Sequence, residues 1–190
     1  MNRCSWVGNN SIYIKYHDTE WGVPVHDDQK IFEYLILETF QAGLSWIIIL
    51  KKRENFRLAF DNFNYKKIAN YSEKKINKLF KDKKIIRNKL KIKAAVINAQ
   101  AYINTQNKFG TFSKYLWRFV NEKPIINNFK SINEIPTKTV LSNKISLDLK
   151  KRGFKFVGPT IIYSHMQAMG MINDHTTDCY RFNEICNSLL

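Results

Sequence analysis

The spacing of apolar residues from Asp28 onward is that of a succession of α-helices. Apolar side chains recur three or four positions apart, as at Ile162, Met166 and Met169, which places them on one helical face. Runs of alternating apolar and polar residues, which predict strands, are missing from the sequence. This pattern predicts an all-α fold.

Eight segments carry the helical pattern, and we expect helices at about residues 28–40, 45–60, 65–70, 73–82, 86–104, 111–120, 137–151 and 161–170. In the longest of them, Leu90, Ala94, Ile97 and Ala101 share one face, and Lys91 lies mostly elsewhere.

A chain of 190 residues is one domain by default and is long enough to bury a core. We therefore expect a single domain over residues 1–190. If the chain forms two lobes around a cleft, one is a helical lobe at about 28–120. The other packs the aromatic, irregular segment 1–26 against the C-terminal region, and the loop 121–136 lies between the lobes.

The charge balance of the chain is strongly basic. Lys and Arg number 31 against 16 Asp and Glu, which gives a net charge of +15. A charge this large favours a polyanionic partner, most often nucleic acid, although a solvated lysine-rich surface is the alternative.

The chain carries no sign of export or of a membrane anchor. Residues 1–6 lack the apolar core of a secretory signal, and the aliphatic run 47–50 is far shorter than the roughly 20 residues of a membrane helix. Three cysteines without such a signal do not make a disulfide framework. We expect a cytoplasmic protein.

Glu38 is the residue whose position most needs an explanation. Ile31, Leu35 and Glu38 follow one another at offsets of four and seven, so they share a helical face, and Glu33 lies on the opposite side. An inward carboxylate is costly unless something binds it. The sequence therefore predicts that Glu38 faces a ligand or pairs with a buried Arg or Lys.

The segment 41–46 breaks the helix that carries Glu38. Gly43 is flexible, Leu44 lies at the tip, and Ser45 is suited to N-capping the helix that Trp46 opens. An acid, an apolar tip and an indole in so short a stretch predict a pocket with a wedge at its mouth.

A second turn, bounded by Gly153 and Gly158, joins two predicted helices, and the later helix opens at Thr160. Glycines let a backbone approach closely, and free amides at a helix start bind phosphate. The basic residues around this turn are Lys150, Lys151, Arg152 and Lys155. This helix-hairpin-helix pattern predicts a salt-sensitive contact with a DNA backbone, and an ordinary glycine-capped corner is the alternative.

Candidate metal ligands lie near the two ends of the chain: Cys4, His17, His175 and Cys179. Two thiolates and two imidazoles fill the tetrahedral shell of Zn²⁺ and leave no open position, which indicates one structural ion. The spacing is not that of a standard zinc motif. Isolated core residues therefore stay an alternative, as does a site that uses His26, His165 or Cys186.

Five motifs are those of a known family: CSW at 4–6, YIKYHD at 13–18, EWGVP at 20–24, QAGLSW at 41–46 and KKRGFKFVG at 150–158. With them the chain resembles the bacterial DNA-3-methyladenine glycosylase I family, within the helix-hairpin-helix glycosylase superfamily, from Cys4 to about Cys179. The resemblance implies a mostly helical fold with a cleft between two lobes. It also implies a monomer that acts on alkylated double-stranded DNA in base excision repair.

The resemblance assigns a base-binding site to this chain. Glu38 takes the place of a Glu that binds the methylated base, and it is the candidate catalytic residue. Aromatic residues surround the base at the places of Tyr16, Trp46, Trp6, Tyr13 and Trp21. The superfamily's usual catalytic Asp is missing from this family, and we assign no catalytic role to Asp174.

The resemblance also implies contacts with DNA and a metal. Leu44, beside Gly43, is associated with the gap left in the duplex. The glycine-bounded turn described above, and not the resemblance, gives the expected backbone contacts: Gly153, Lys155, Gly158 and Thr160. One structural Zn²⁺ is held at the places of Cys4, His17, His175 and Cys179.

These inferences predict an enzyme that flips 3-methyladenine out of DNA, hydrolyses its glycosidic bond and leaves an abasic site. No lysine is an obvious Schiff-base nucleophile, so we expect no strand cleavage. One alternative is a non-catalytic helix-hairpin-helix DNA-binding protein. Another is a metallohydrolase with catalytic zinc, which a complete Cys₂His₂ shell argues against.

Overall fold

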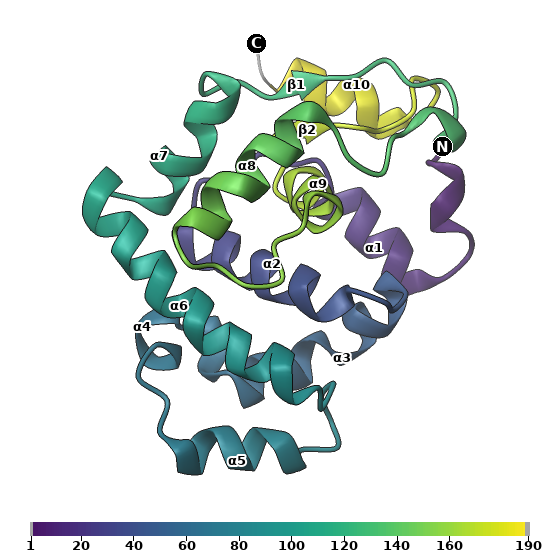
Figure 1. The fold of residues 1–190 in the computed structure, drawn as a ribbon. Helices are drawn as coiled ribbons and strands as arrows, with labels where there is room; N and C mark the ends of the chain where they lie inside the picture. Colours follow the sequence, from purple (N-terminus) through teal and green to yellow (C-terminus); the bar gives the residue numbers. More distant parts are fainter. Residues whose placement is uncertain (1, 189–190) are drawn as a thin grey trace.

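The computed structural model describes residues 2–188, and it consists mostly of helices (Figure 1). The α-helices are α1 (Ser11–Thr19), α2 (Asp28–Gln41), α3 (Trp46–Ala59), α4 (Tyr65–Ile68), α5 (Glu73–Lys81), α6 (Lys89–Phe109), α7 (Phe112–Trp117), α8 (Val140–Lys151), α9 (Pro159–Ala168) and α10 (Tyr180–Asn187). Short 3₁₀ helices are η1 (Ser5–Val7), η2 (Asp61–Phe63), η3 (Arg118–Val120) and η4 (Ile132–Glu134). The strands are β1 (Ile125–Ile126) and β2 (Ile172–Asn173).

The predicted helical fold is confirmed. Each of the eight expected helices is present, although α6 is shifted toward the C-terminus and the segment expected at 111–120 divides into α7 and η3. The described residues contain one departure from the all-α prediction, a parallel ladder that pairs Ile125 with Ile172 and Ile126 with Asn173. The division into lobes stays a prediction.

The expectation of an irregular N-terminal segment was wrong, because residues 11–19 form α1. The Asn10 side chain caps this helix by accepting from the backbone N–H of Ile12 at 3.0 Å. The buried residues of α1 are Tyr16 and His17 rather than aliphatic ones. Hence the apolar period that marks the other helices is missing. The helix α10 was also not predicted.

The expected apolar face of α6 was partly wrong. Ala94 and Ala101 are buried, but Leu90 and Ile97 are 69% and 39% exposed. Lys91 is buried instead, because its ammonium group reaches backbone carbonyls at the end of α2.

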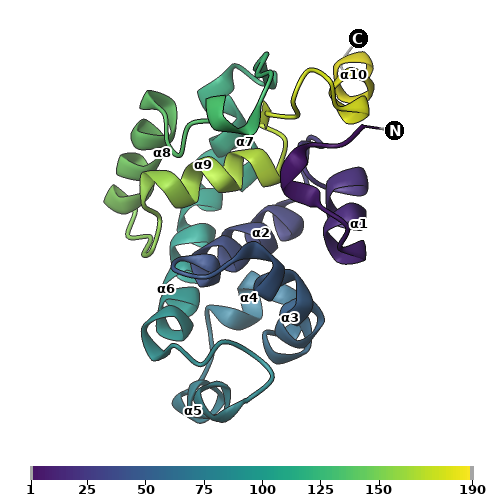
Figure 2. The same ribbon diagram turned by 90° about the vertical axis from the view of Figure 1, so that its right-hand side faces the viewer.

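The helix α2 is the element against which the others pack. Its residues from Ile31 to Phe40 are buried without interruption, so it has no solvent-facing stripe. Asp27 caps it by accepting from the N–H of Lys30 at 2.8 Å. The helix α9 lies across α2 on one side, and α3 lies on the other (Figure 2).

The helices α8 and α9 form the predicted pair on either side of a turn. A reciprocal capping box between Thr139 and Ser142 starts α8. Gly158 is the N-cap of α9, and Pro159 occupies its first turn, where a missing N–H costs nothing. The second helix therefore opens one residue before the predicted Thr160.

A single cluster of buried apolar side chains reaches from Cys4 to Cys179. The two ends of the chain therefore share one core with α2. Among residues 2–188, no helix is both long and apolar enough to cross a membrane.

Gly170 fixes the approach of α9 to the segment before α2. Its φ is +69°, and a Cβ at this position would overlap the backbone of Val23 and Pro24. We expect Gly170→Ala to lower the free energy of unfolding by about 3 kcal/mol or more. Gly110 has a φ of +84° and open space around it, so Gly110→Ala should cost only about 1 kcal/mol. Urea denaturation measures both, and equal losses would contradict the close approach.

Candidate base pocket and metal-ligand cluster

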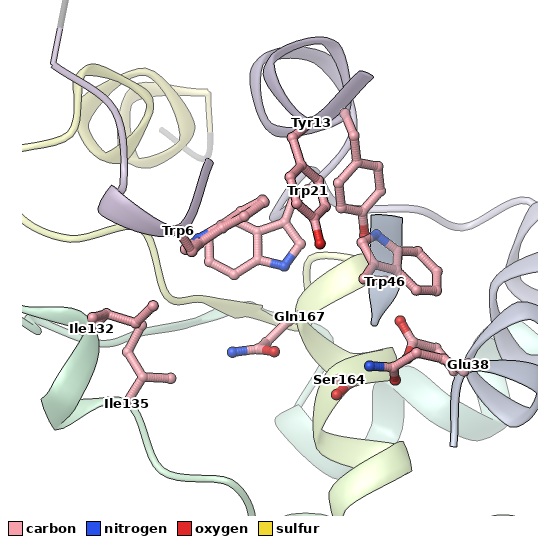
Figure 3. A pocket seen from close by; sticks show the side chains of 11 residues that line it. Trp6, Tyr13, Trp21, Glu38, Trp46, Ile132, Ile135, Ser164 and Gln167 are labelled. Atoms are coloured by element: carbon pink, nitrogen blue, oxygen red, sulfur yellow. The ribbon is translucent and has the colours of Figure 1, made fainter. Parts of the chain in front are cut away.

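A cavity of about 230 Å³ lies where α1, the end of α2, the start of α3, and α9 meet (Figure 3). Its lining residues are Trp6, Tyr13, Tyr16, Trp21, Glu38, Gln41, Trp46, Ile132, Ile135, Ser164 and Gln167. All six residues that the resemblance assigned to the base therefore line one cavity. They come from the first quarter of the chain, and the opposite wall comes from η4, Ile135 and α9.

Glu38 projects into this cavity with no countercharge. Its side chain is buried, and Oε2 has no hydrogen-bond partner among the described residues. Burial raises the pKa of the Glu38 carboxyl from 4.5 to about 8, because the surroundings do not solvate the charged form. A buried acid without a partner lacks the usual structural explanation, which leaves a ligand as the explanation.

The alternative that Glu38 pairs with a buried cation is contradicted, because no ion pair joins Glu38 to an Arg or Lys among the described residues. Arg53 of α3 donates to Glu33 at 2.6 Å and to Glu20 at 2.7 Å. Arg57 also donates to Glu33, at 2.8 Å. Glu33, on the other side of α2, is thus the structural acid of this helix, and Glu38 is left free.

Aromatic rings form the remaining walls of the cavity. Tyr16 and Trp46 lie with their ring centroids 5.6 Å apart and tilted. Trp6 meets Tyr13 and Trp21 edge to face, at 5.5 and 5.1 Å. The faces of such rings are negative and attract a cation that enters the cavity.

Two polar atoms of this aromatic wall differ in their partners. The Tyr13 hydroxyl accepts from the N–H of Ile47, at the start of α3, at 3.0 Å. The Trp46 Nε1–H is buried without a partner among residues 2–188. Among the described residues, the lining therefore contains a buried acceptor, Glu38 Oε2, and a buried donor, Trp46 Nε1, that both lack a partner.

Sequence reasoning missed part of the lining: Gln41, Ile132, Ile135, Ser164 and Gln167. Gln41 follows Glu38 by three residues on one helix, so helical spacing could have identified it. The others come from segments whose approach to α2 depends on tertiary packing, and no local signal marks them.

Asp174 holds Gln167 against the cavity instead of facing it. Its buried carboxylate accepts from the Asn127 amide at 2.6 Å, the Tyr163 hydroxyl at 2.7 Å and Gln167 Nε2 at 2.8 Å. Because the carboxylate only accepts, the Gln167 amide turns its NH₂ toward Asp174, which leaves its oxygen for the cavity (Figure 3). These contacts agree with assigning no catalytic role to Asp174.

The turn from Ala42 to Ser45, named here the wedge turn, ends α2 beside the cavity. Gly43 has a φ of +82°, in the region that favours glycine, and Leu44 is 37% exposed. Ser45 occupies the N-cap position of α3, but its side chain makes no capping hydrogen bond, so that expectation was wrong. An apolar side chain thus stands at the surface next to the cavity.

The segment 152–158, named here the hairpin, joins α8 to α9. Gly153 has a φ of +94°, and Lys155 and Thr160 are exposed. The N–H groups of the first turn of α9 lack intrahelical partners, as at any helix start. Arg152 is an exception among the basic residues, because it donates to Asp148 at 2.6 Å and is neutralised there.

The four predicted metal ligands meet at one point, although they come from the two ends of the chain. The ligand atoms of Cys4, His17, His175 and Cys179 all lie within 4.8 Å of one another, and all four residues are buried. Cys179 Sγ is 3.4 Å from His17 Nε2 and 3.5 Å from His175 Nδ1. A tetrahedral Zn²⁺ with bonds of about 2.3 Å to S and 2.0 Å to N places these atoms about 3.5 Å apart. The cluster therefore fits zinc.

The outer ring nitrogens of both histidines are also held, as is usual for metal ligands. His17 Nδ1 is 2.8 Å from Asp18 Oδ1, and the Asp18 carboxylate in turn accepts from both Nε and Nη2 of Arg3. His175 Nε2 is 3.0 Å from the carbonyl oxygen of Trp21, which lines the cavity. These partners fix the inner nitrogens toward the cluster.

The competing ligand candidates lie elsewhere. His26 stacks on Trp117, and buried His165 is 3.1 Å from the carbonyl oxygen of Ile31. Cys186 contacts Asn173 and is not part of the cluster.

Comparison with known proteins identifies the family that the sequence motifs indicated. The family model described as "Methyladenine glycosylase" matches residues 6–182. The DNA-3-methyladenine glycosylase of Haemophilus influenzae is 49% identical over 177 residues, which cover 93% of this chain and 96% of that protein. DNA-3-methyladenine glycosylase 1 of Escherichia coli is also 49% identical, over 179 residues that cover 94% of this chain and 96% of that protein.

A solved structure of a protein with the same activity in its name is also similar to this chain. It describes 3-methyladenine recognition by 3-methyladenine DNA glycosylase I from Staphylococcus aureus. That structure superposes with a TM-score of 0.91 at 37% identity, covering 95% of this chain and 96% of that one.

The raised pKa of Glu38 predicts how stability depends on pH. Between the ordinary carboxyl pKa of 4.5 and the folded value of about 8, the folded state binds a proton that the unfolded chain does not. The free energy of unfolding therefore falls through this window as the pH rises. Glu38→Gln removes this contribution, so the variant should gain stability relative to the wild type from about pH 5 to about pH 9. Denaturation of both proteins across this range measures the difference, and parallel profiles would contradict the raised pKa.

Proposed function

The chain belongs to the methyladenine glycosylase family, and we propose that it is a DNA repair N-glycosylase that excises 3-methyladenine from alkylated DNA. The products are free 3-methyladenine and an abasic site. The observation that carries the proposal is an unpaired buried carboxylate in a cavity walled by indole and phenol rings. We also propose that the enzyme acts as a monomer, and that it acts in the bacterial cytoplasm, where its chromosomal DNA substrate lies.

The substrate base enters the pocket outside the double helix. A stacked base cannot be reached by groups in a cavity, so it must be flipped out of the duplex. Methylation at N3 makes the adenine in DNA cationic, and such a ring is attracted to the negative faces of the aromatic side chains that line the pocket, Tyr16 and Trp46 among them. A neutral, undamaged base gains none of this stabilisation.

Glu38 supplies the second part of base recognition. Its carboxylate accepts a hydrogen bond from the exocyclic amine of adenine, whereas guanine presents a carbonyl oxygen at the same place. A carboxylate facing that oxygen would be left without a donor. The positive base also favours the ionised form of Glu38, which opposes the effect of burial on its pKa.

The reaction needs no strong general acid, because the cationic base is already a good leaving group. When the bond between C1′ and N9 breaks, its electron pair stays on N9, and the base departs neutral. The sugar is left as an oxocarbenium-like cation, which nearby phosphates and the carboxylate stabilise. Water then attacks C1′ and loses a proton. No lysine lines the cavity within residues 2–188, which supports hydrolysis without strand cleavage.

Two turns hold the DNA. Leu44 of the wedge turn fills the gap that the flipped base leaves, with Gly43 beside it. The hairpin binds the phosphate backbone through Gly153, Lys155 and Gly158, with Thr160 at the start of α9. The exposure of Leu44 and Lys155 supports these roles.

We also propose that the protein binds one structural zinc ion. When bound, the ion cross-links the N-terminal segment to the segment before α10 through Cys4, His17, His175 and Cys179. His175 also touches the Trp21 carbonyl, so the same ligand set supports one wall of the pocket. Four protein ligands leave no position for a substrate, which argues against the catalytic-zinc alternative. A purely DNA-binding role leaves the unpaired Glu38 unexplained.

Replacing the carboxylate tests the proposed activity. Glu38→Gln keeps the shape of the side chain but removes the charge, so we expect DNA binding to persist and 3-methyladenine release to fall by about 100-fold. Chromatography of bases released from methylated DNA measures this loss. The exposed Glu54 offers a matched control, and Glu54→Gln should behave as wild type. Near-normal release by Glu38→Gln would disprove the role of Glu38.

Substitution of single cysteines tests the proposed zinc site separately. Cys179→Ala removes one ligand, so the purified protein should lose its zinc, and its thermal midpoint should fall by at least about 5 °C. Cys186→Ala, which removes a thiol outside the cluster, should keep one zinc per chain. Elemental analysis decides, and full zinc content in Cys179→Ala would overturn the ligand assignment.

A further inference from the structure

Lys91 of α6 is buried, and its ammonium group binds the backbone of the wedge turn. Its Nζ donates to the carbonyl oxygen of Phe40 at 2.9 Å and to that of Ala42 at 2.6 Å. These carbonyls belong to the last turn of α2, where helical carbonyls lack partners and the helix dipole favours a cation. A positive side chain from another helix thus fixes the backbone that carries Gly43 and Leu44.

Asn98, on the same helix, binds the backbone of the hairpin in a similar way. It is fully buried, its Nδ2 donates to the carbonyl oxygen of Lys155 at 3.0 Å, and its Oδ1 accepts from the Lys155 N–H at 2.7 Å. This double contact satisfies both backbone groups of Lys155. It also fixes the entry to Phe156, a non-glycine residue with a φ of +55°.

The two side chains stand seven residues apart on α6. Two helical turns separate them, so they project from nearly the same face with a rise of about 10.5 Å between them. Figure 1 shows α6 passing the end of α2 and the connection between α8 and α9. One rigid helix therefore holds two turns that lie more than a hundred residues apart in the chain.

We propose that Lys91 and Asn98 are positioning residues that set the distance between the wedge turn and the hairpin. The inference rests on the proposed function, in which Leu44 enters the duplex while the hairpin holds its backbone. If either turn shifts, one contact with DNA is made at the expense of the other. Neither residue touches the base or its sugar.

The wedge half of the inference is tested by Lys91→Met, which keeps the length of the side chain and removes its donors. Lys93, two residues further on the same helix, is exposed, so Lys93→Met controls for the lost charge. We expect kcat/KM for 3-methyladenine release from duplex DNA to fall at least about tenfold in Lys91→Met relative to Lys93→Met. Affinity for free 3-methyladenine should be unchanged, because the pocket is intact.

A double-mutant cycle separates positioning from a general structural effect. If Lys91 acts through the wedge turn, Leu44→Ala should cost much less in the Lys91→Met background than in the wild type. Additive losses, or equal rates for Lys91→Met and Lys93→Met, would overturn this half. If Lys91→Met does not fold, Lys91→Arg, which keeps the charge but changes the reach, takes its place in the cycle.

The hairpin half is tested by Asn98→Asp, which preserves shape but cannot donate to the Lys155 carbonyl. The exposed Asn104 of α6 provides the matched control, Asn104→Asp, with the same added charge. Affinity for undamaged duplex DNA should fall about tenfold in the first variant relative to the second. Equal affinities would overturn the role of Asn98.

The outcomes separate this inference from the proposed function. A wild-type protein that releases no 3-methyladenine would refute the function, and the duplex-binding comparison would still test the hairpin half. Wild-type release with Lys91→Met equal to its control would refute the wedge half alone.

Discussion

A buried carboxylate without a partner is the constraint on which the site depends. Proteins rarely leave such a group unpaired, because its desolvation is not offset. Glu38 nevertheless lies on a helix whose residues from Ile31 to Phe40 are all buried, while the guanidinium of Arg53 on α3 is bound by Glu33 and Glu20. Because Arg53 is paired with other acids, Glu38 has neither a countercharge nor a hydrogen-bond donor among the described residues. A positively charged ligand that donates a hydrogen bond would supply both. A cationic purine has both the positive charge and the hydrogen-bond donor.

The remaining structure holds that carboxylate among aromatic rings. The helix α1 delivers Tyr13 and Tyr16, and the Cys₂His₂ cluster ties the segment that carries Trp6 and Trp21 to the end of the chain. Because His175 contacts the Trp21 carbonyl, the metal-ligand cluster and the pocket share a wall. Stability of the cluster and shape of the pocket are therefore linked, even though four protein ligands would leave a bound ion no open position for chemistry.

Most of the fold could be predicted from the sequence, because apolar spacing marks each long helix. Predictions from apolar spacing were wrong where the buried side chains are not aliphatic. The helix α1 buries Tyr16 and His17, and α6 buries Lys91 while Leu90 is exposed. Local pattern and the family motifs together identified Glu38, the aromatic walls and the four metal ligands. They could not identify Ser164, Gln167 or Ile135, because these residues join the cavity only through the packing of α9 and the segment after β1.

The most direct test of the account is the ionisation of Glu38 itself. Carbon-13 NMR of the labelled side-chain carboxyl, followed through a pH titration, reports its pKa in the free protein and with 3-methyladenine bound. We predict a pKa of about 8 in the free protein, together with a change of the carboxyl signal when the base binds. An ordinary pKa near 4.5 in the free protein, or a carboxyl signal that ignores the base, would contradict it.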